Sequence, residues 1–220
     1  MIKCRILFEK VGRAKYISHL DLMRTFQHSF IRAGIRIKHT EGFNPHPYIS
    51  IALPLQLGCE SLCELLDIQL EDGDEIETIP ERLNPWLPEG VRALSAAAPE
   101  GKVGQLRRVR CAAELVYDDG NAAARLEGLR ELFARPSLVI EKKTKRGVGE
   151  LDLAPNIGDV KLEEASETVL RLEAVVSAME PTVNPSNLTD AVTRNAPALT
   201  PDFARYRRLE VYDAEMRVFR

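Results

Sequence analysis

The sequence has 220 residues, of which 45% are apolar and 29% charged, and this ordinary balance excludes a mainly disordered chain. Its length allows one large domain or two small ones, each with a core that needs no disulfide or metal. No apolar run approaches the roughly 18 residues of a membrane span, and the first residues lack the apolar segment of a signal peptide. We therefore expect a cytoplasmic protein with no membrane partner.

The net charge of -3 hides an uneven distribution along the chain. Residues 1–58 hold nine Lys or Arg against three acids, together with all four histidines, whereas residues 59–100 hold two against eleven. Residues 101–220 balance at nineteen each. This pattern predicts either a one-sided surface that attracts an anion such as nucleic acid, or merely a solvated helix with acidic ends.

The first hundred residues predict elements in the order β-α-β-β-α-β, with an enlarged middle hairpin. Strands are expected at 2–8, 35–38, 48–53, 62–70 and 91–97, and helices at 18–34 and 74–84. The first helix has the clearest boundaries, because Ser18 suits the N-cap, Asp21 follows as a capping-box variant, and Gly34 suits a left-handed C-terminal position. Helical spacing predicts that its inward face is formed by Leu20, Met23, Phe26 or Gln27, Phe30 and Ala33.

The remaining residues predict the same order of elements a second time. Strands are expected at 109–117, 138–143, 168–176 and 206–212, and helices at 122–134 and 185–194. Residues 99–104 contain the breakers of a connection, and residues 145–150 are expected to form a mobile basic loop. The sequence therefore predicts an α+β protein of two ferredoxin-like halves, 1–100 and 101–220, with antiparallel sheets and helices on one face.

The turn before the first helix is a candidate ligand site. His19 lies in the first turn of that helix, where free backbone amides favour an anion such as phosphate. A functional interpretation combines His19 with Arg24 and with Lys15 from the basic turn over 10–15. The alternative is that His19 only hydrogen-bonds its neighbours, and a capping role accounts fully for Asp21.

The segment Gly42-Phe43-Asn44-Pro45-His46-Pro47 predicts a stiff loop, because each proline keeps the preceding residue out of the helical region. Such a loop can display Phe43 to stack on a base, Asn44 to bind its edge, and His46 beside them. The alternative for Phe43 is a buried anchor under the loop.

Cofactor and metal motifs are weak in this sequence. Cys59 and Cys63 have the first spacing of a CxxxCxxC cluster motif, but Leu66 occupies the third position, so an iron-sulfur cluster would lack a ligand. A zinc site of His39 and His46 with both cysteines would match no familiar spacing. No phosphate-loop or dinucleotide motif occurs, so we expect no cofactor and no metal, and the four cysteines should be thiols.

Basic clusters in the second part of the sequence are candidates for phosphate contact, although each is more often a solvated strand end. They are Arg107-Arg108-Arg110, Lys142-Lys143-Thr144-Lys145-Arg146 and Arg205-Arg207-Arg208. Lys142, Lys143, Lys145 and Arg146 are the preferred ligand-binding residues among them.

Two motifs carry a resemblance to a known family. FEKVGRAKYISHLDLMR at 8–24 and GFNPHP at 42–47 resemble the signature of the radical SAM-linked family, a domain of unknown function found alone or fused behind a B12-binding radical SAM module. Further matches within the first 70 residues are Ile49-Ser50, Pro54-Leu55, Gly58, Ser61, Glu64 and Asp67. The basic run at 142–146 followed by Leu151-Asp152-Leu153 resembles a second family pattern, but Ala154 stands where an arginine would often follow.

The resemblance implies an accessory partner of a separately encoded radical SAM enzyme, which binds substrate, with RNA as the expected class, or docks on the enzyme. The alternative is a metal-independent RNA-processing or transfer enzyme with His19 as general acid or base and with Arg24 and Lys15 stabilising charge. A single histidine without an evident partner favours the first hypothesis. Fold analogy does not choose between them.

Overall fold

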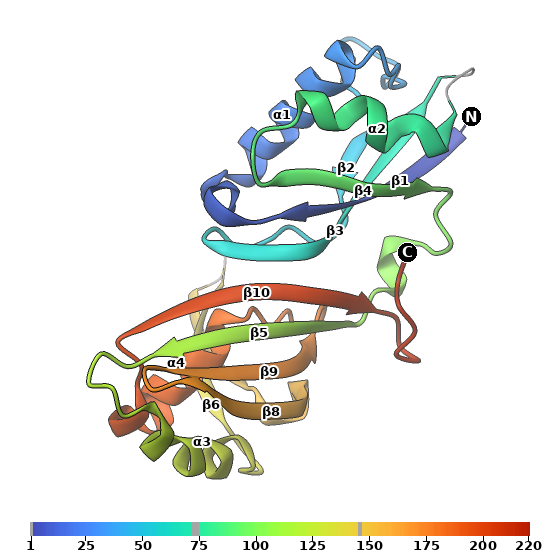
Figure 1. Cartoon of the computed structure of the whole chain (residues 1–220). Coiled ribbons are helices and arrows are strands. Elements are labelled where there is room, and N and C mark those ends of the chain that lie inside the picture. Colours follow the sequence, from blue (N-terminus) through green and yellow to red (C-terminus); the bar gives the residue numbers. More distant parts are fainter. Residues whose placement is uncertain (1, 72–74, 145–146) are drawn as a thin grey trace. The chain divides into compact units, whose positions relative to one another are not determined.

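The computed structural model describes residues 2–71, 75–144 and 147–220, and these form two compact units. Unit 1 comprises Met1–Leu106 with Arg217–Arg220, and unit 2 comprises Arg107–Met216. Each unit combines helices with antiparallel strands (Figure 1), so the predicted α+β class is confirmed. The finer prediction, a repeated ferredoxin-like fold, stays a prediction.

The strands of unit 1 are β1 (Ile2–Lys10), β2 (Ile49–Ile51), β3 (Cys59–Leu70) and β4 (Val91–Ala97). They pair antiparallel in the order β4-β1-β3-β2. Helix α1 (His19–Arg32) connects β1 to β2, and α2 (Ile79–Leu83) connects β3 to β4. Both helices lie on one face of these strands (Figure 1).

Short 3-10 turns complete unit 1 at Gly12–Tyr16, Ile76–Thr78, Asn84–Trp86 and Val103–Gln105. The helix expected at 74–84 is α-helical only over Ile79–Leu83, because Pro80 in its first turn has no amide hydrogen to bond to the preceding turn; its expected start at Asp74 lies outside the described residues. Residues 35–38 were predicted as a strand but contribute only one isolated bridge, between Ile37 and Leu70.

The core of unit 1 lies between the helices and the strands. Phe8 of β1 packs edge-on against Phe26 of α1, with ring centroids 4.9 Å apart, and Phe26 stacks on Phe30 at 6.2 Å. All three rings are almost completely buried, and each such burial contributes about 1.5–3 kcal/mol relative to exposure. This core fixes α1 against β1.

The ends of α1 agree with the prediction. Its inward face agrees in part, since Phe26 and Phe30 are buried and Met23 and Ala33 pack against the core. Ser18 is the N-cap, its Oγ accepting from the Asp21 amide at 3.2 Å, and Gly34 has a φ of +65°. Leu20, which was expected to pack inward, is 67% exposed. Leu22 is buried in its place, because it lies four residues before Phe26 and so shares its face.

Unit 2 contains β5 (Arg108–Val116), β6 (Val139–Thr144), β7 (Gly147–Asp152), β8 (Ile157–Ser166), β9 (Val169–Ser177) and β10 (Phe203–Tyr212). Four of them pair antiparallel in the order β10-β5-β9-β8, and β6 with β7 forms a separate hairpin. Helix α3 (Leu126–Phe133) packs on β8, and α4 (Ser186–Asn195) packs on β6. Short 3-10 turns lie at Ala122–Arg125, Ala154–Asn156 and Pro197–Leu199.

Two features of unit 2 differ from the prediction. Residues 147–150 were expected in a loop but form most of β7, whose glycines at 147 and 149 weaken the strand signal. Strand β8 was not predicted, because its pattern is mostly exposed and charged. Among the helices of the described residues, none is long and apolar enough to cross a membrane.

Candidate functional site

The Thr40–Tyr48 loop joins α1 to β2 and is closed at its base by hydrogen bonds. The Thr40 amide donates to the His46 carbonyl at 2.8 Å, and the His46 amide donates to Thr40 Oγ1 at 3.1 Å. The same hydroxyl lies 3.1 Å from His46 Nδ1. These contacts hold the two sides of the loop together and leave residues 41–45 at its tip.

The tip of this loop displays an aromatic ring to solvent. Phe43 is fully exposed, at 109% of its reference area, so the alternative of a buried anchor is wrong. Asn44 and His46 are exposed beside it. Phenylalanine is among the residues most often found inside proteins, and a fully exposed ring on a closed loop therefore suggests a contact surface.

A depression of about 370 Å³ lies next to this loop in unit 1. It is lined by residues of β1, β2, β3 and the loop: Lys3, Cys4, Thr40, His46, Pro47, Tyr48, Ile49, Ser50, Asp67, Ile68, Gln69 and Pro99. This volume is near the lower end of the roughly 300–1,000 Å³ of small-molecule sites. The predicted residue His46 thus lines a concave surface that the sequence did not reveal.

The backbone around the depression is held by the sheet. The Tyr48 amide donates to the Lys38 carbonyl at 2.8 Å, and the Gln69 amide donates to the Tyr48 carbonyl at 3.1 Å. Directly after Tyr48, Ile49 pairs with Ile68 in the β2–β3 ladder. Tyr48 is 38% exposed, so a partly open phenol ring is carried on a fixed backbone.

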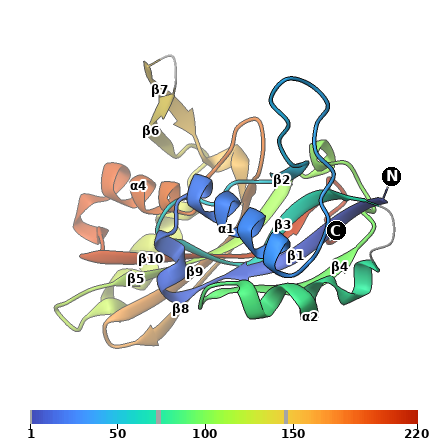
Figure 2. The same ribbon diagram turned by 90° about the horizontal axis from the view of Figure 1, so that it is seen from above.

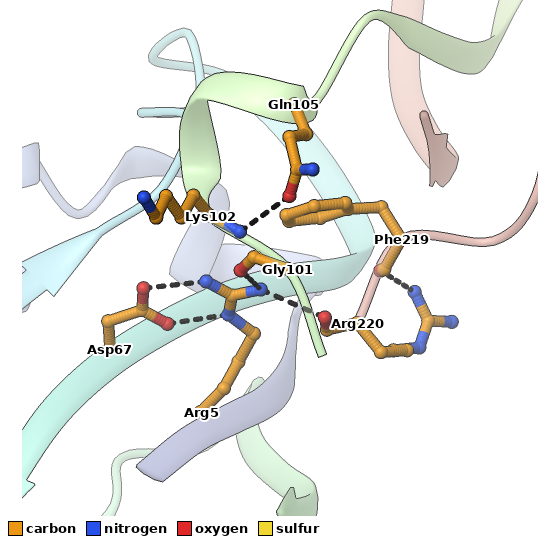
Figure 3. A network of polar contacts seen from close by, with 7 residues as sticks. All are labelled: Arg5, Asp67, Gly101, Lys102, Gln105, Phe219 and Arg220. Atoms are coloured by element: carbon orange, nitrogen blue, oxygen red, sulfur yellow. Dashed lines mark hydrogen bonds and ion pairs between the residues drawn. The ribbon is translucent and has the colours of Figure 1, made fainter. Parts of the chain in front are cut away.

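An ion pair supports one wall of the depression (Figure 3). Arg5 Nε and Nη2 donate to the two carboxylate oxygens of Asp67 at 2.6 and 2.7 Å. Arg5 Nη1 also donates to the carbonyls of Gly101 and Arg220, at 3.1 and 2.9 Å. The guanidinium lies 4.9 Å from the ring centroid of Phe219. The carboxylate of Asp67 is therefore fixed in place, and its charge is balanced by a buried arginine.

Cys4, one of the residues that line the depression, is uncharged. Burial, followed by the negative charges of Asp67 and Glu77, raises the pKa of the Cys4 thiol to about 12. Cys4 is thus a neutral, apolar group at neutral pH.

Structural contacts account for Lys10, at the start of the turn at 10–19, and for Arg24 of α1. Lys10 is 2% exposed, and its Nζ donates to the Ile17 carbonyl at 2.8 Å, which ties the turn to the end of β1. Burial lowers the pKa of Lys10, while electrostatic interactions with Glu64 and Cys59 act in the opposite direction. Arg24 donates to Asp21 at 3.2 Å, and both side chains are exposed.

His19 and Lys15 lie at the surface of this turn. The imidazole of His19 makes no hydrogen bond or ion pair with any residue in the described ranges. A second depression, of about 540 Å³, is lined by the neighbouring Gly12 and Arg13 but by neither His19 nor Lys15.

The two predicted sites of unit 1 lie at opposite ends of β3 (Figure 2). The Lys15 carbonyl accepts from the Gly58 amide, just before β3 begins, whereas Tyr48 bonds to Gln69 near its end. Residues 59 and 69 of one strand are about 33 Å apart. The structure therefore brings Phe43, Asn44 and His46 together and places His19, Lys15 and Arg24 elsewhere.

The β6–β7 hairpin carries the predicted basic run. Lys142 Nζ donates to the Thr182 carbonyl, and burial lowers the pKa of this lysine. The side chain of Lys143, and Lys145 and Arg146 as a whole, lie outside what the structure describes. Asp152 accepts hydrogen bonds from Ser137, from the Leu138 amide and from the Ala154 amide, so this part of the family pattern stabilises the hairpin base.

Several arginines of the other two basic clusters form ion pairs or are buried. Arg110 pairs with Asp159 at 2.7 Å and Arg205 with Glu114 at 3.2 Å, while Arg208 is buried. These contacts favour a structural role for these arginines within β5 and β10.

Within the described ranges, no three His, Cys, Asp or Glu side chains gather closely enough to hold a metal ion. Cys59 and Cys63 are buried thiols on one strand, and four residues of a strand span about 13 Å, too far for one ion to bind both.

Sequence reasoning did not single out Lys3, Thr40 or Tyr48, which line the depression, or the Arg5–Asp67 pair. Only Asp67 had a signal, as one of the residues shared with the family. Lys3 and Tyr48 become neighbours through strand pairing, and single-sequence patterns do not specify which strands pair.

The two units thus form an α+β protein with a loop and depression in its first unit as the candidate site. The comparison with protein families supports the part of the resemblance that concerns a domain of unknown function. Residues 3–185 match the model of an uncharacterized protein family conserved in bacteria (DUF2344), and the chain belongs to this family. No curated protein matches the sequence.

Proposed function

We propose that the chain is an accessory partner of a separately encoded radical SAM enzyme and that it binds single-stranded RNA through the Thr40–Tyr48 loop. The resemblance of residues 8–24 and 42–47 to the radical SAM-linked signature supports the enzyme partner. The geometry of the loop supports the ligand class.

The exposed ring of Phe43 is the observation that carries the RNA proposal. Every base has a flat face, and stacking of a base on an aromatic side chain contributes about 1–3 kcal/mol. The amide of Asn44, next to this ring, has both a donor and an acceptor for a base edge. The hydrogen bonds between Thr40 and His46 already order the loop, so binding costs little further conformational entropy.

The opposite end of unit 1 offers a surface for the enzyme. Tyr16, Leu20 and Leu57 are 65%, 67% and 62% exposed. The hydrogen bond from the Gly58 amide to the Lys15 carbonyl, 3.0 Å long, brings Leu57 beside the turn that carries Tyr16. Large apolar side chains of this kind are typical of protein contact surfaces, so RNA and enzyme would use different ends of the unit.

The alternative of an enzyme that uses His19 as general acid or base has no comparable support. A catalytic imidazole is normally oriented by a second group. Within the described part of the chain His19 has no such partner, and Arg24 is engaged with Asp21.

The RNA proposal is tested by fluorescence anisotropy with a labelled single-stranded oligonucleotide. Phe43→Ala should weaken binding roughly 5- to 100-fold, from the loss of one stacked base. Phe203→Ala is the matched control, since Phe203 is also exposed, at 56%, but belongs to β10 of unit 2. Equal affinity of the Phe43→Ala variant and the wild type would refute the proposal.

The partner proposal is tested by sedimentation of the purified chain with the radical SAM enzyme of the same organism. A complex should form, and Leu20→Ser should weaken it without lowering the melting temperature, since the side chain is largely exposed. Absence of any complex at concentrations of tens of micromolar would contradict a stable partnership.

We also propose that both units are ferredoxin-like and correspond to the predicted halves 1–100 and 101–220. Unit 1 supports this with the element order β-α-β-β-α-β and the strand order β4-β1-β3-β2. Unit 2 has the equivalent strand order, β10-β5-β9-β8, once the β6–β7 hairpin is treated as an insertion.

A further inference from the structure

We propose that the depression beside the loop is a binding site for a single unstacked nucleotide, with Tyr48 contacting the base and Lys3 the phosphate. This inference rests on the proposed RNA function and assigns a ligand to a surface distinct from the ring of Phe43. The volume of about 370 Å³ suits one nucleotide and is too small for a duplex.

Tyr48 is suited to hold a base because its ring is partly open and its backbone is fixed. It lines the depression at 38% exposure, between the hydrogen bonds to Lys38 and Gln69. An aromatic ring on a fixed backbone loses little conformational freedom upon binding. Its face can stack on the base of a free nucleotide or of a nucleotide within an RNA strand.

Lys3 is suited to bind a phosphate because its charge is not used elsewhere. It is exposed on β1, opposite Gln69 in the β1–β3 register, and lines the depression. Across the described ranges, its Nζ has neither a hydrogen bond nor an ion pair. A lysine of this kind contributes one point charge to a phosphate contact.

Among the described residues that line the depression, Asp67 is the one with a carboxylate, and it does not oppose an anion. Asp67 is bound at both oxygens by Arg5, which is itself buried at 5% exposure. The pair is neutral overall, and adding Lys3 leaves a net positive charge. Cys4, which also lines the depression, is a neutral thiol and adds no charge.

Hydroxyl groups complete the lining on the side of β2 and the loop. Ser50 lies opposite Asp67 in the β2–β3 ladder, and Thr40 holds His46 at the rim. Hydroxyls donate and accept, so they can bind a ribose or a base edge. The set combines an aromatic wall, a cation and hydroxyls, which matches the three chemical parts of a nucleotide.

The site is tested by calorimetric titration of the full chain with AMP, GMP, CMP and UMP, and in parallel with a single-stranded RNA oligonucleotide. Tyr48→Ala should weaken binding roughly 5- to 100-fold, and Tyr48→Phe should retain it because the stacking face remains. Lys3→Ala should weaken oligonucleotide binding and reduce its log-log salt slope by about 0.7. The matched controls are Phe203→Ala, which removes an exposed aromatic ring of β10, and Lys161→Ala, which removes an exposed lysine of β8.

The two arms distinguish the source of the nucleotide. If mononucleotides bind and the variants weaken this binding as expected, the site takes free nucleotides. If only the oligonucleotide binds, with the same effects of the variants, the site takes a nucleotide within a strand. Oligonucleotide binding that depends on Phe43 but not on Tyr48 or Lys3 would overturn the inference while leaving the proposed function intact. If wild-type chain binds no RNA, the proposed function fails, and the mononucleotide arm decides the inference alone: binding sustains it and no binding overturns it.

Discussion

Arg5 and Asp67 lie directly opposite each other in the β1–β3 register and are joined by two hydrogen bonds, of 2.6 and 2.7 Å. Arg5 is buried, whereas the Asp67 side chain is 28% exposed at the edge of the depression. The same arginine binds the carbonyls of Gly101 and Arg220, so residues from both ends of the chain meet at this pair.

Asp67→Ala should lower the free energy of unfolding of unit 1 more than replacement of both Arg5 and Asp67 by apolar residues. Asp67→Ala leaves a buried guanidinium without its counter-charge, which costs about 3–5 kcal/mol in typical cases. The double variant Arg5→Met, Asp67→Leu should recover part of this loss, because no buried charge remains. Urea unfolding of the single and double variants measures the difference, and a double variant less stable than Asp67→Ala would contradict the argument.

The closure of the loop depends on the hydroxyl of Thr40. Thr40→Val keeps the shape but removes the contacts with the His46 amide and ring, each worth about 0.5–1.5 kcal/mol. We expect weaker binding of single-stranded RNA with Phe43 still present, because the loop must then be ordered by the ligand. Thr40→Ser retains the hydroxyl and should bind like the wild type; equal loss in both variants would show that the hydroxyl does not account for the effect.

The thiols should be unreactive in the native protein. All four cysteines are buried, and the pKa of Cys4 is raised to about 12 by burial and by the charges of Asp67 and Glu77. Titration with a thiol reagent at pH 8 should therefore give negligible reaction in buffer and four equivalents in denaturant, because the thiolate is the reactive form. A stoichiometric reaction within seconds in buffer would contradict the burial of these residues.

Alkaline pH should destabilise unit 2 through Tyr117. Its hydroxyl donates to the Leu199 carbonyl at 2.9 Å, and burial raises its pKa to about 12, with Arg125 acting in the opposite direction and Asp202 and Asp119 adding to the rise. The unfolded state, with an ordinary pKa near 10, releases its proton first. The stabilisation that protonated Tyr117 gives to the folded state is therefore complete below pH 10. It falls by about 2–3 kcal/mol as the pH rises toward 12.

Tyr117→Phe isolates this effect, because the variant has no group to titrate at that position. It should be about 0.5–1.5 kcal/mol less stable at pH 8, from the lost hydrogen bond, and should lose less stability than the wild type between pH 10 and 12. Parallel pH profiles of the two proteins would show that Tyr117 does not titrate as argued.

Local sequence signals predicted the elements with strong periodicity or clear boundaries. Ser18 and Gly34 marked the ends of α1, and the limits expected for β4 agree with the structure. Leu20 was misplaced because it lies six residues before Phe26, which turns it about 120° away from the face that packs on Phe8. Strand β8 was missed because a largely solvent-exposed strand shows little alternation of apolar residues.

The candidate site was predicted only where it lies within one loop. Phe43, Asn44 and His46 are neighbours in the sequence, so their display could be expected from prolines and glycine alone. Lys3, Tyr48 and Asp67 come together through the β1–β3 and β3–β2 pairings, which are set by the whole fold. For the same reason, the sequence did not show that His19 and His46 lie at opposite ends of β3.

The location of bound RNA is the most direct test of the account. A single-stranded RNA with 4-thiouridine, cross-linked by light to the full chain and analysed by peptide mass spectrometry, reports which residues contact the bases. We predict cross-links at Phe43 and Tyr48, within the segment 38–50. Cross-links confined to the β6–β7 hairpin or to the turn at 10–19 would contradict the assignment of the loop and depression as the RNA site.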